Sequence, residues 1–253
     1  MLKRYIAGKF RHPDGFSGRL VGRLMATGNR KAVDWTVSLL DIEADDHLLE
    51  VGFGPGVAIE LARRAGAGRI AGVDSSSTMV DVARRRNAHA VEAGLVDLRC
   101  GDAAFLPYAS RTFDKVFSIH CIYFWANPVR ALREFQRVLV SGGIVAVTIL
   151  PKDRWREHKT VPPADLFTLY GAAEVAALLE QAGFHDVRVE DGEGSGKLRC
   201  ACIIGTKRSG AGAGNARESA LMPRGTRAAA GVAAPASRPF ASAAASSTLE
   251  ENT

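Results

Sequence analysis

A run of alternating glycines behind an apolar segment is the feature that most limits how this chain can fold. Residues 48–56 read Leu-Leu-Glu-Val-Gly-Phe-Gly-Pro-Gly, with glycines at Gly52, Gly54 and Gly56. Glycine lets a backbone turn sharply off a strand and approach a ligand closely. The next apolar run ends in Asp74, and an acidic residue in that place can bind both hydroxyls of a ribose. These features predict a nucleoside-containing cofactor at the carboxyl edge of a parallel sheet.

The spacing of the glycines separates this pattern from the dinucleotide fingerprint. That fingerprint is G-x-G-x-x-G and receives a pyrophosphate, whereas this chain has G-x-G-x-G. A glycine triplet alone is weak evidence for a cofactor site. The evidence becomes stronger because a strand precedes the glycines, a helical pattern follows them and Asp74 lies at the expected spacing. The alternative is a glycine-rich turn in another kind of α/β protein.

Strand-like and helix-like segments alternate through most of the chain. The predicted strands are 47–51, 69–73, 96–100, 113–119, 144–150, 184–189 and 198–206. The predicted helices between them are 57–65, 75–93, 128–140 and 172–182. Such alternation indicates a mostly parallel sheet covered on both faces. The last two strands have no helix between them, which predicts a hairpin and an antiparallel member at the edge. The predicted fold is a Rossmann-like, doubly wound, seven-stranded α/β sheet.

Three regions are predicted from composition and pattern. Residues 1–30 are basic and carry apolar residues at helical spacing, so they form either a lid over the site or a fixed helix at the sheet edge. Residues 31–208 form the α/β domain. From 209 to 253 the chain is rich in Ala, Gly and Ser and has almost no large apolar residue. Such a segment cannot offset its ordering entropy by burial, so we expect a disordered tail.

Composition also narrows the class of protein. No apolar run is long enough to cross a bilayer, and no apolar signal region follows the charged N-terminus, so we expect a cytoplasmic protein. The net charge of +6 is spread over helix faces, which does not favour a nucleic-acid partner. The cysteines fit no common zinc spacing, so no metal is expected; they are Cys100, Cys121, Cys200 and Cys202.

Five motifs in order resemble those of the class I S-adenosylmethionine-dependent methyltransferases. The motifs are 49–56, 72–74, 101–103, 113–114 and 139–143, and the resemblance covers roughly residues 30 to 206. The closest likeness is to the small-molecule branch that includes the quinone and sterol C-methyltransferases. The resemblance implies transfer of a methyl group from S-adenosylmethionine to a small organic acceptor, in secondary metabolism or in quinone or lipid metabolism. It leaves open the acceptor, the methylated atom and the oligomeric state.

The resemblance also implies roles for individual residues. The three glycines would lie against the methionine part and the ribose, and Asp74 would hold the ribose hydroxyls. Asp102 would bind the adenine amino group, and His120 would face the sulfonium. The complete implied cofactor set is Glu50, Gly52, Gly54, Gly56, Asp74, Ser75, Met79, Asp102, Ala103 and His120. Phe53 departs from the small or polar residue common in the family, and it is tolerable if it points into the core.

The loop after the fourth strand holds the candidate catalytic residues, His120 and Tyr123. Histidine titrates near neutrality, so His120 could be a base, and a structural or cofactor-contacting histidine is equally compatible. Residues 121–125 read Cys-Ile-Tyr-Phe-Trp, and aromatic faces in such a loop could hold an apolar acceptor and attract a sulfonium. Tyr123 is assigned to the site, whereas Trp125 fits the site and a core anchor equally.

Two other classes of function compete with methyl transfer. A nicotinamide-dependent oxidoreductase requires G-x-G-x-x-G and a catalytic pair such as Tyr-Lys, and neither is seen. A methyltransferase-like binding protein without catalysis is disfavoured by the intact glycines and by the two acidic residues Glu50 and Asp74.

Overall fold

The computed structural model describes residues 27–156, 167–194 and 198–209. The predicted N-terminal lid or helix lies outside this part, apart from its last four residues. The predicted tail lies outside it as well, apart from Ser209.

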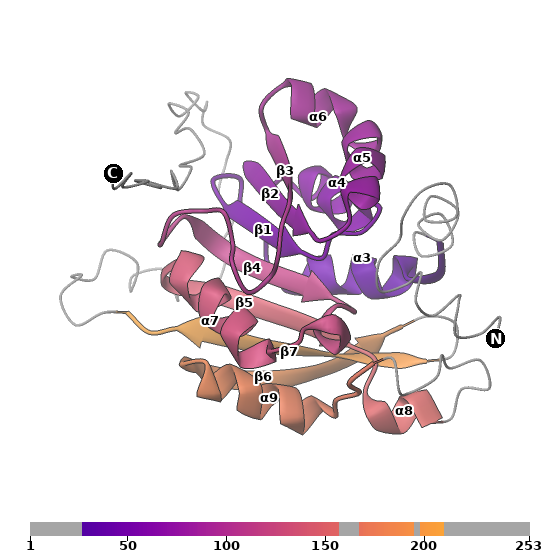
Figure 1. The fold of residues 1–253 in the computed structure, drawn as a ribbon, viewed down its shortest axis with the longest axis vertical. Helices are drawn as coiled ribbons and strands as arrows, with labels where there is room; N and C mark the ends of the chain where they lie inside the picture. The colour runs from indigo at the N-terminus through magenta and orange to yellow at the C-terminus, as the bar shows by residue number, and fades with distance from the viewer. Residues whose placement is uncertain (1–26, 157–166, 195–197, 210–253) are drawn as a thin grey trace, which may run out of the picture.

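A seven-stranded sheet forms the centre of the protein, in the order β3-β2-β1-β4-β5-β7-β6 (Figure 1). The strands are β1 His47–Val51, β2 Arg69–Asp74, β3 Val96–Cys100, β4 Phe113–Ile119, β5 Leu139–Ile149, β6 Phe184–Glu193 and β7 Arg199–Lys207. The first five strands run parallel to one another. The strand order reverses at β1 and β4, which is where open α/β sheets bind ligands beyond the carboxyl ends of the strands.

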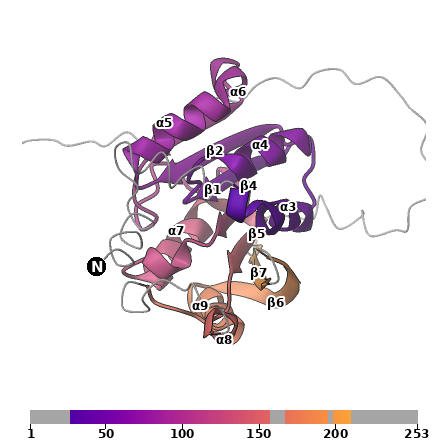
Figure 2. The same ribbon diagram turned by 90° about the vertical axis from the view of Figure 1, so that its right-hand side faces the viewer.

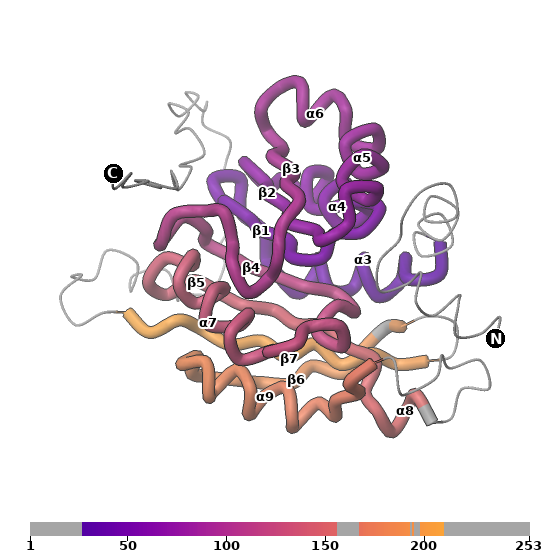
Figure 3. The backbone as a smooth tube through the Cα atoms, in the orientation of Figure 1, coloured from indigo at the N-terminus to yellow at the C-terminus, as the bar shows by residue number. Residues whose placement is uncertain are grey.

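The last two strands form the predicted antiparallel hairpin at one side of the sheet. β7 runs antiparallel to both β5 and β6 and lies between them, so β6 is the outermost strand (Figure 3). This arrangement confirms the predicted fold class. It also brings the start of β7 to the edge of the sheet where β4 and β5 end.

Helices cover both faces of the sheet (Figure 2). The helices are α3 Arg30–Leu39, α4 Val57–Arg64, α5 Ser77–Arg86, α6 Ala88–Glu92, α7 Pro128–Val138, α8 Lys152–Arg156 and α9 Ala172–Gln181, with a 3-10 turn η1 at Ile122–Phe124. One buried cluster holds the apolar faces of α3, α4 and α5, and a second holds those of α7 and α9. None of the helices in the described ranges is both long and apolar enough to span a membrane.

The predicted start of the fifth strand was wrong, because β5 begins at Leu139 rather than at residue 144. The helix α7 ends at Val138, and the Ser-Gly-Gly segment continues the strand. Gly143 permits this, since a Cβ atom there would lie 2.9 Å from the carbonyl oxygen of Asp114 on β4. The pairing of β4 with β5 is irregular at this point, and glycine commonly marks such a bulge.

The single predicted helix over 75–93 was also wrong, because Asn87 divides it into α5 and α6. The side-chain amide of Asn87 donates to the carbonyl of Ala83 at 3.0 Å and to that of Gly56 at 3.2 Å. An asparagine that bonds the backbone in this way competes with regular helix. The break therefore ties the end of α5 to the glycine loop.

Candidate functional site

A cavity of about 480 Å³ opens at the carboxyl ends of β1, β2 and β4, a size in the usual range for small-molecule sites. Nine of the predicted cofactor residues line it: Glu50, Gly52, Gly54, Asp74, Ser75, Met79, Asp102, Ala103 and His120. Gly56 and Tyr123 are not among the lining residues. The topology therefore gathers at one site residues that are up to 70 positions apart in the sequence.

The loop from Gly52 to Gly56 turns through three left-handed residues. Its glycines have φ values of 78°, 51° and 75°, a region that glycine adopts without steric cost. At Gly52 a Cβ atom would also collide with the thiol of Cys121. This thiol donates to the Gly52 carbonyl at 3.2 Å. The turn off β1 is therefore closed against the loop that follows β4.

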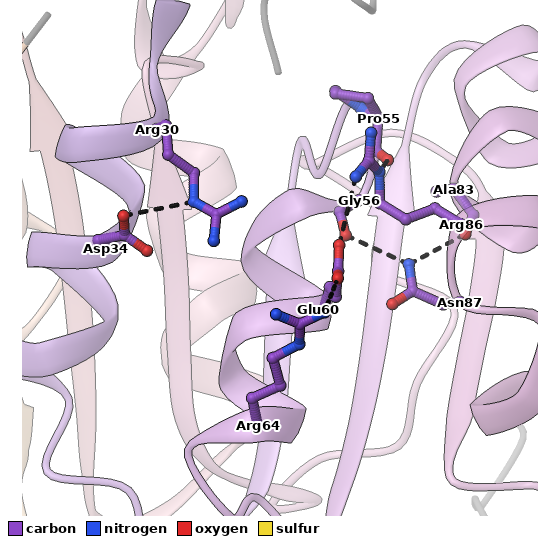
Figure 4. Close-up of polar contacts among 9 residues, drawn as sticks. All are labelled: Arg30, Asp34, Pro55, Gly56, Glu60, Arg64, Ala83, Arg86 and Asn87. Carbon is purple, nitrogen blue, oxygen red and sulfur yellow. Dashed lines mark hydrogen bonds and ion pairs between the residues drawn. The ribbon is translucent and has the colours of Figure 1, made fainter. Parts of the chain in front are cut away.

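Gly56 is required for helix packing rather than for ligand contact. A Cβ atom there would lie 2.7 Å from the Cβ atom of Ala83 on α5. The end of α5 braces the loop further, because Arg86 donates to the Pro55 carbonyl at 2.9 Å and pairs with Glu60 at 3.2 Å (Figure 4). Asn87 adds its bond to the Gly56 carbonyl in the same view (Figure 4). Rigid contacts of this kind preorganise a binding loop.

Asp74 lies at the end of β2 and holds the glycine loop in place. One carboxylate oxygen accepts from the Gly54 N–H at 2.8 Å, and the other accepts from the Ser76 N–H at 2.9 Å. A carboxylate offers about four acceptor positions, so a side chain that shapes the loop can also accept from a ligand. Its residual exposure of 8% faces the cavity that it lines.

Glu50 is the second buried acid of the site. It is 3% exposed, and its Oε2 atom has no hydrogen-bond partner among the described residues. Burial, with a smaller contribution from the charge of Asp74, raises the pKa of Glu50 to about 8. A buried acid with an unsatisfied oxygen beside a cavity is suited to a ligand that brings a positive charge.

Phe53, which departs from the family pattern, points into the core, and this is the orientation in which a phenylalanine is tolerable at this position. Its side chain is 3% exposed and packs in the cluster under α3, α4 and α5. Gly72 on β2 makes the room, since a Cβ atom there would lie 2.6 Å from the Phe53 ring.

The loop after β3 forms the far wall of the cavity. Asp102 is exposed there and accepts from the Ala104 N–H at 2.8 Å, and it forms a short bridge with Phe105. Ala103 is buried beneath it. Ser75 and Met79 line the cavity from the start of α5. The predicted adenine contacts thus share one end of the cavity.

His120 lies in a strained backbone conformation at the end of β4. Its φ angle is 58°, which is uncommon for a residue other than glycine and is often found at functional sites. The half-buried ring has Nδ1 at 3.5 Å from the Tyr123 hydroxyl and Nε2 at 3.8 Å from the thiol of Cys200. Burial lowers the pKa of His120 to about 4, so the ring is neutral at physiological pH.

Tyr123 is a structural residue in this fold, and the sequence assignment to the ligand site is not supported by its position. Its hydroxyl accepts from the Leu150 N–H at 2.5 Å and donates to the Leu150 carbonyl at 3.2 Å. The ring packs edge-on against Trp155. Burial also raises the pKa of Tyr123. The side chain therefore fastens η1 to the end of β5, away from the cavity lining.

Several lining residues escaped the sequence analysis. Cys121 was assigned no role beyond the 121–125 loop, Phe105 and Arg130 belong to no motif, and Asn29 lies before α3. Trp125 combines both readings left open for it, since it lines the cavity and packs edge-on against Phe135 in the core. The guanidinium of Arg130 stacks over the Phe105 ring, 3.9 Å from its centre. Only the packing of α3 and α7 across the cavity could have identified these residues.

Comparison with known proteins agrees with this geometry. Residues 49–147 match the methyltransferase domain family. The uncharacterized methyltransferase YdaC of Bacillus subtilis is 30% identical over 172 residues, which cover 68% of this chain and 89% of YdaC. The chain therefore belongs to the methyltransferase family.

More distant relatives place the fold within the same group. Demethylmenaquinone methyltransferase of Symbiobacterium thermophilum is 38% identical over 100 residues, but these cover only 39% of this chain and 40% of that protein. The crystal structure of a SAM-dependent methyltransferase from Aquifex aeolicus superposes with a TM-score of 0.58 at 19% identity, over 70% of this chain and 90% of that one. The protein thus has the Rossmann-like methyltransferase fold.

Proposed function

We propose that this methyltransferase uses S-adenosylmethionine and methylates a small organic acceptor. The observation that carries the proposal is the pair of buried acids, Glu50 and Asp74, at adjacent strand ends in one cavity with the glycine loop. Each acid would bind a different group of the same ligand.

The residues present fit this cofactor. The unsatisfied oxygen of Glu50 would accept from the amino group of the methionine part. Asp74 would accept from the ribose hydroxyls, and Asp102 from the adenine amino group. Gly52 and Gly54 leave the backbone bare where the cofactor would pass. No metal is needed for these contacts.

Bound S-adenosylmethionine supplies an activated methyl group on a positively charged sulfur. The protein then has to position the acceptor in line with that group and exclude water. Such alignment can provide about 7–11 kcal/mol of the barrier reduction. Phe124, Trp125 and Ala131 line the cavity on the side of α7 and η1, where aromatic faces would hold an acceptor and favour a cationic centre.

A nicotinamide-dependent oxidoreductase is not favoured. The glycines are spaced G-x-G-x-G, whereas the pyrophosphate turn of a dinucleotide site has G-x-G-x-x-G. The names of relatives such as demethylmenaquinone methyltransferase support quinone-like acceptors as one class to test.

Calorimetry with S-adenosylmethionine, S-adenosylhomocysteine and NAD tests the cofactor. We expect binding of the first two and none of NAD. Incubation of the purified protein and cofactor with a metabolite extract, followed by mass spectrometry for products that gain one methyl group, then identifies the acceptor. Binding of NAD in preference to both sulfur ligands would contradict the proposal.

A further inference from the structure

The strained histidine at the end of β4 offers no free ring nitrogen to a substrate. The Tyr123 hydroxyl, which bonds both the N–H and the carbonyl of Leu150, lies 3.5 Å from His120 Nδ1. The Cys200 thiol lies 3.8 Å from Nε2, within hydrogen-bond distance for sulfur. With both nitrogens used by the protein, His120 is a wall of the cavity rather than a base.

Three other titratable groups of the described lining have roles other than that of a base at the end of β4. The Cys121 thiol lies 3.2 Å from the carbonyl oxygens of both Gly52 and Ile119, which share its proton, and burial raises the pKa of this thiol. Glu50 is protonated at neutral pH before a ligand binds, because of its raised pKa. Asp74 holds two backbone N–H groups.

Asp102 lies in the loop after β3 rather than at the end of β4, and its carboxylate accepts from the Ala104 N–H at 2.8 Å. β3 itself lies three positions from β4 in the sheet, which separates the two strands by about 14 Å at about 4.8 Å per strand. The described lining thus holds no base beside the end of β4.

Arg130 is the one arginine or lysine in the same described lining. It projects from the first turn of α7 and stacks on the exposed ring of Phe105. Among the residues that the structure describes, no carboxylate lies within ion-pair distance of Arg130. Glu134, one helical turn further on, pairs with Arg137 instead. Stacking leaves the N–H edge of a guanidinium available to an anion.

We infer that the acceptor of this enzyme is an anion that reacts in its own ionised form, such as an acidic phenol, an enol or a carboxylate, and that Arg130 attracts it. The inference rests on the proposed methyl transfer and names its substrate class. The acceptor anion forms its new bond to the methyl carbon with its own electron pair. The electron pair of the broken S–CH₃ bond stays on sulfur as a neutral thioether, so charge balances and no proton has to leave.

Rates of methylation for phenols of graded acidity test the inference. We expect kcat/KM for each phenol to rise with pH along the ionisation of that phenol, so that the curves shift with its acidity. Benzyl alcohols of the same shape should not react. If kcat/KM instead rose at the same pH for all acceptors, a base on the protein would be titrating, and the inference would be overturned. The inference would also be overturned if the protein bound S-adenosylmethionine but methylated none of the phenols, enols and carboxylates offered.

Two variants separate the residues involved. Arg130→Gln should raise KM for the reactive anion about tenfold, while Arg133→Gln, an exposed neighbour on the same helix, should not change it. His120→Asn keeps a residue that tolerates a positive φ, and its pH profile should still follow the acceptor. If the wild-type protein showed a rise of kcat/KM at one pH for all acceptors, and the His120→Asn variant lost it, His120 would be identified as the base. Failure of the wild-type protein to bind S-adenosylmethionine would instead contradict the proposed function itself.

Discussion

The carboxylate of Asp74 is bonded to the backbone N–H of Gly54 across twenty residues of sequence, at 2.8 Å. The residue expected to bind the ribose is therefore also the residue that shapes the loop around the methionine part. In the proposed function, cofactor affinity and loop geometry therefore depend on the same side chain.

Replacing Asp74 should accordingly affect both binding and stability. Charge-assisted hydrogen bonds contribute about 1.5–3 kcal/mol each, so Asp74→Ala should weaken S-adenosylhomocysteine binding by roughly ten- to hundredfold or more. It also leaves two buried N–H groups without an acceptor, which should lower the free energy of unfolding by about 1–3 kcal/mol. Asp74→Asn keeps one side-chain oxygen, so it should lose less affinity for S-adenosylhomocysteine and less free energy of unfolding than Asp74→Ala. Calorimetry and urea unfolding measure the two effects, and unchanged affinity in a folded Asp74→Ala protein would remove this residue from the site.

The buried acid Glu50 should make stability fall as pH rises. Its pKa is raised from 4.5 to about 8 on folding, so the folded protein holds a proton that the unfolded chain releases. The free energy of unfolding then decreases between about pH 4.5 and pH 8, at no more than about 1.4 kcal/mol per pH unit from this group. Glu50→Gln should remove this slope. The free energy of unfolding is to be measured at pH 5 and at pH 8 for the wild-type and Glu50→Gln proteins. An equal change between the two pH values in both proteins would contradict the prediction.

Cofactor binding should release a proton from the same group. At pH 6.5–7 Glu50 is mostly protonated, and the ammonium group of S-adenosylhomocysteine would favour the carboxylate. Binding enthalpies measured in buffers with different ionisation enthalpies should show release of up to one proton per site. The Glu50→Gln variant should bind more weakly and show no release from this position. An equal proton count in both proteins would place the ammonium elsewhere.

Gly52 and Cys121 form a pair whose substitutions should not be additive. Gly52→Ala places a Cβ atom onto the Cys121 thiol and imposes a positive φ on alanine, a strain of about 1–3 kcal/mol before the collision is counted. Cys121→Gly in the same chain should recover the part due to the collision and leave the part due to φ. A double-mutant cycle in thermal unfolding measures this coupling. Strict additivity would show that the loop moves apart without cost.

Deletion of residues 210–253 should leave the melting temperature and cofactor affinity nearly unchanged. The segment contains few large apolar residues that could pack on the domain. Scanning calorimetry of the full and shortened chains provides the comparison. A fall of several degrees on deletion would show that the segment packs against the sheet or its helices.

The sequence predicted the sheet, and nine of the residues that line the cavity, because both depend on local signals. Alternating apolar runs mark the strands, and the glycines and Asp74 lie next to strand ends, where topology has to bring them together. The rest of the lining depends on packing between distant segments. The sequence did not predict that Tyr123 bonds Leu150 and lies outside the cavity lining, because its partner is a backbone group that carries no side-chain signal. Arg130 was not predicted as a lining residue, because its position depends on stacking against Phe105 in the loop after β3.

The position of β7 in the sheet has a consequence for the order in which the protein is assembled during synthesis. β6 leaves the ribosome before β7, yet it cannot pair with β5, because β7 lies between them. The outer edge of β5 therefore stays unpaired until about residue 207 has emerged, and exposed strand edges invite aggregation. Cys200, which completes the contact with His120, arrives only with this last strand. A nascent chain with a finished glycine loop thus still lacks the thiol that faces Nε2 of His120.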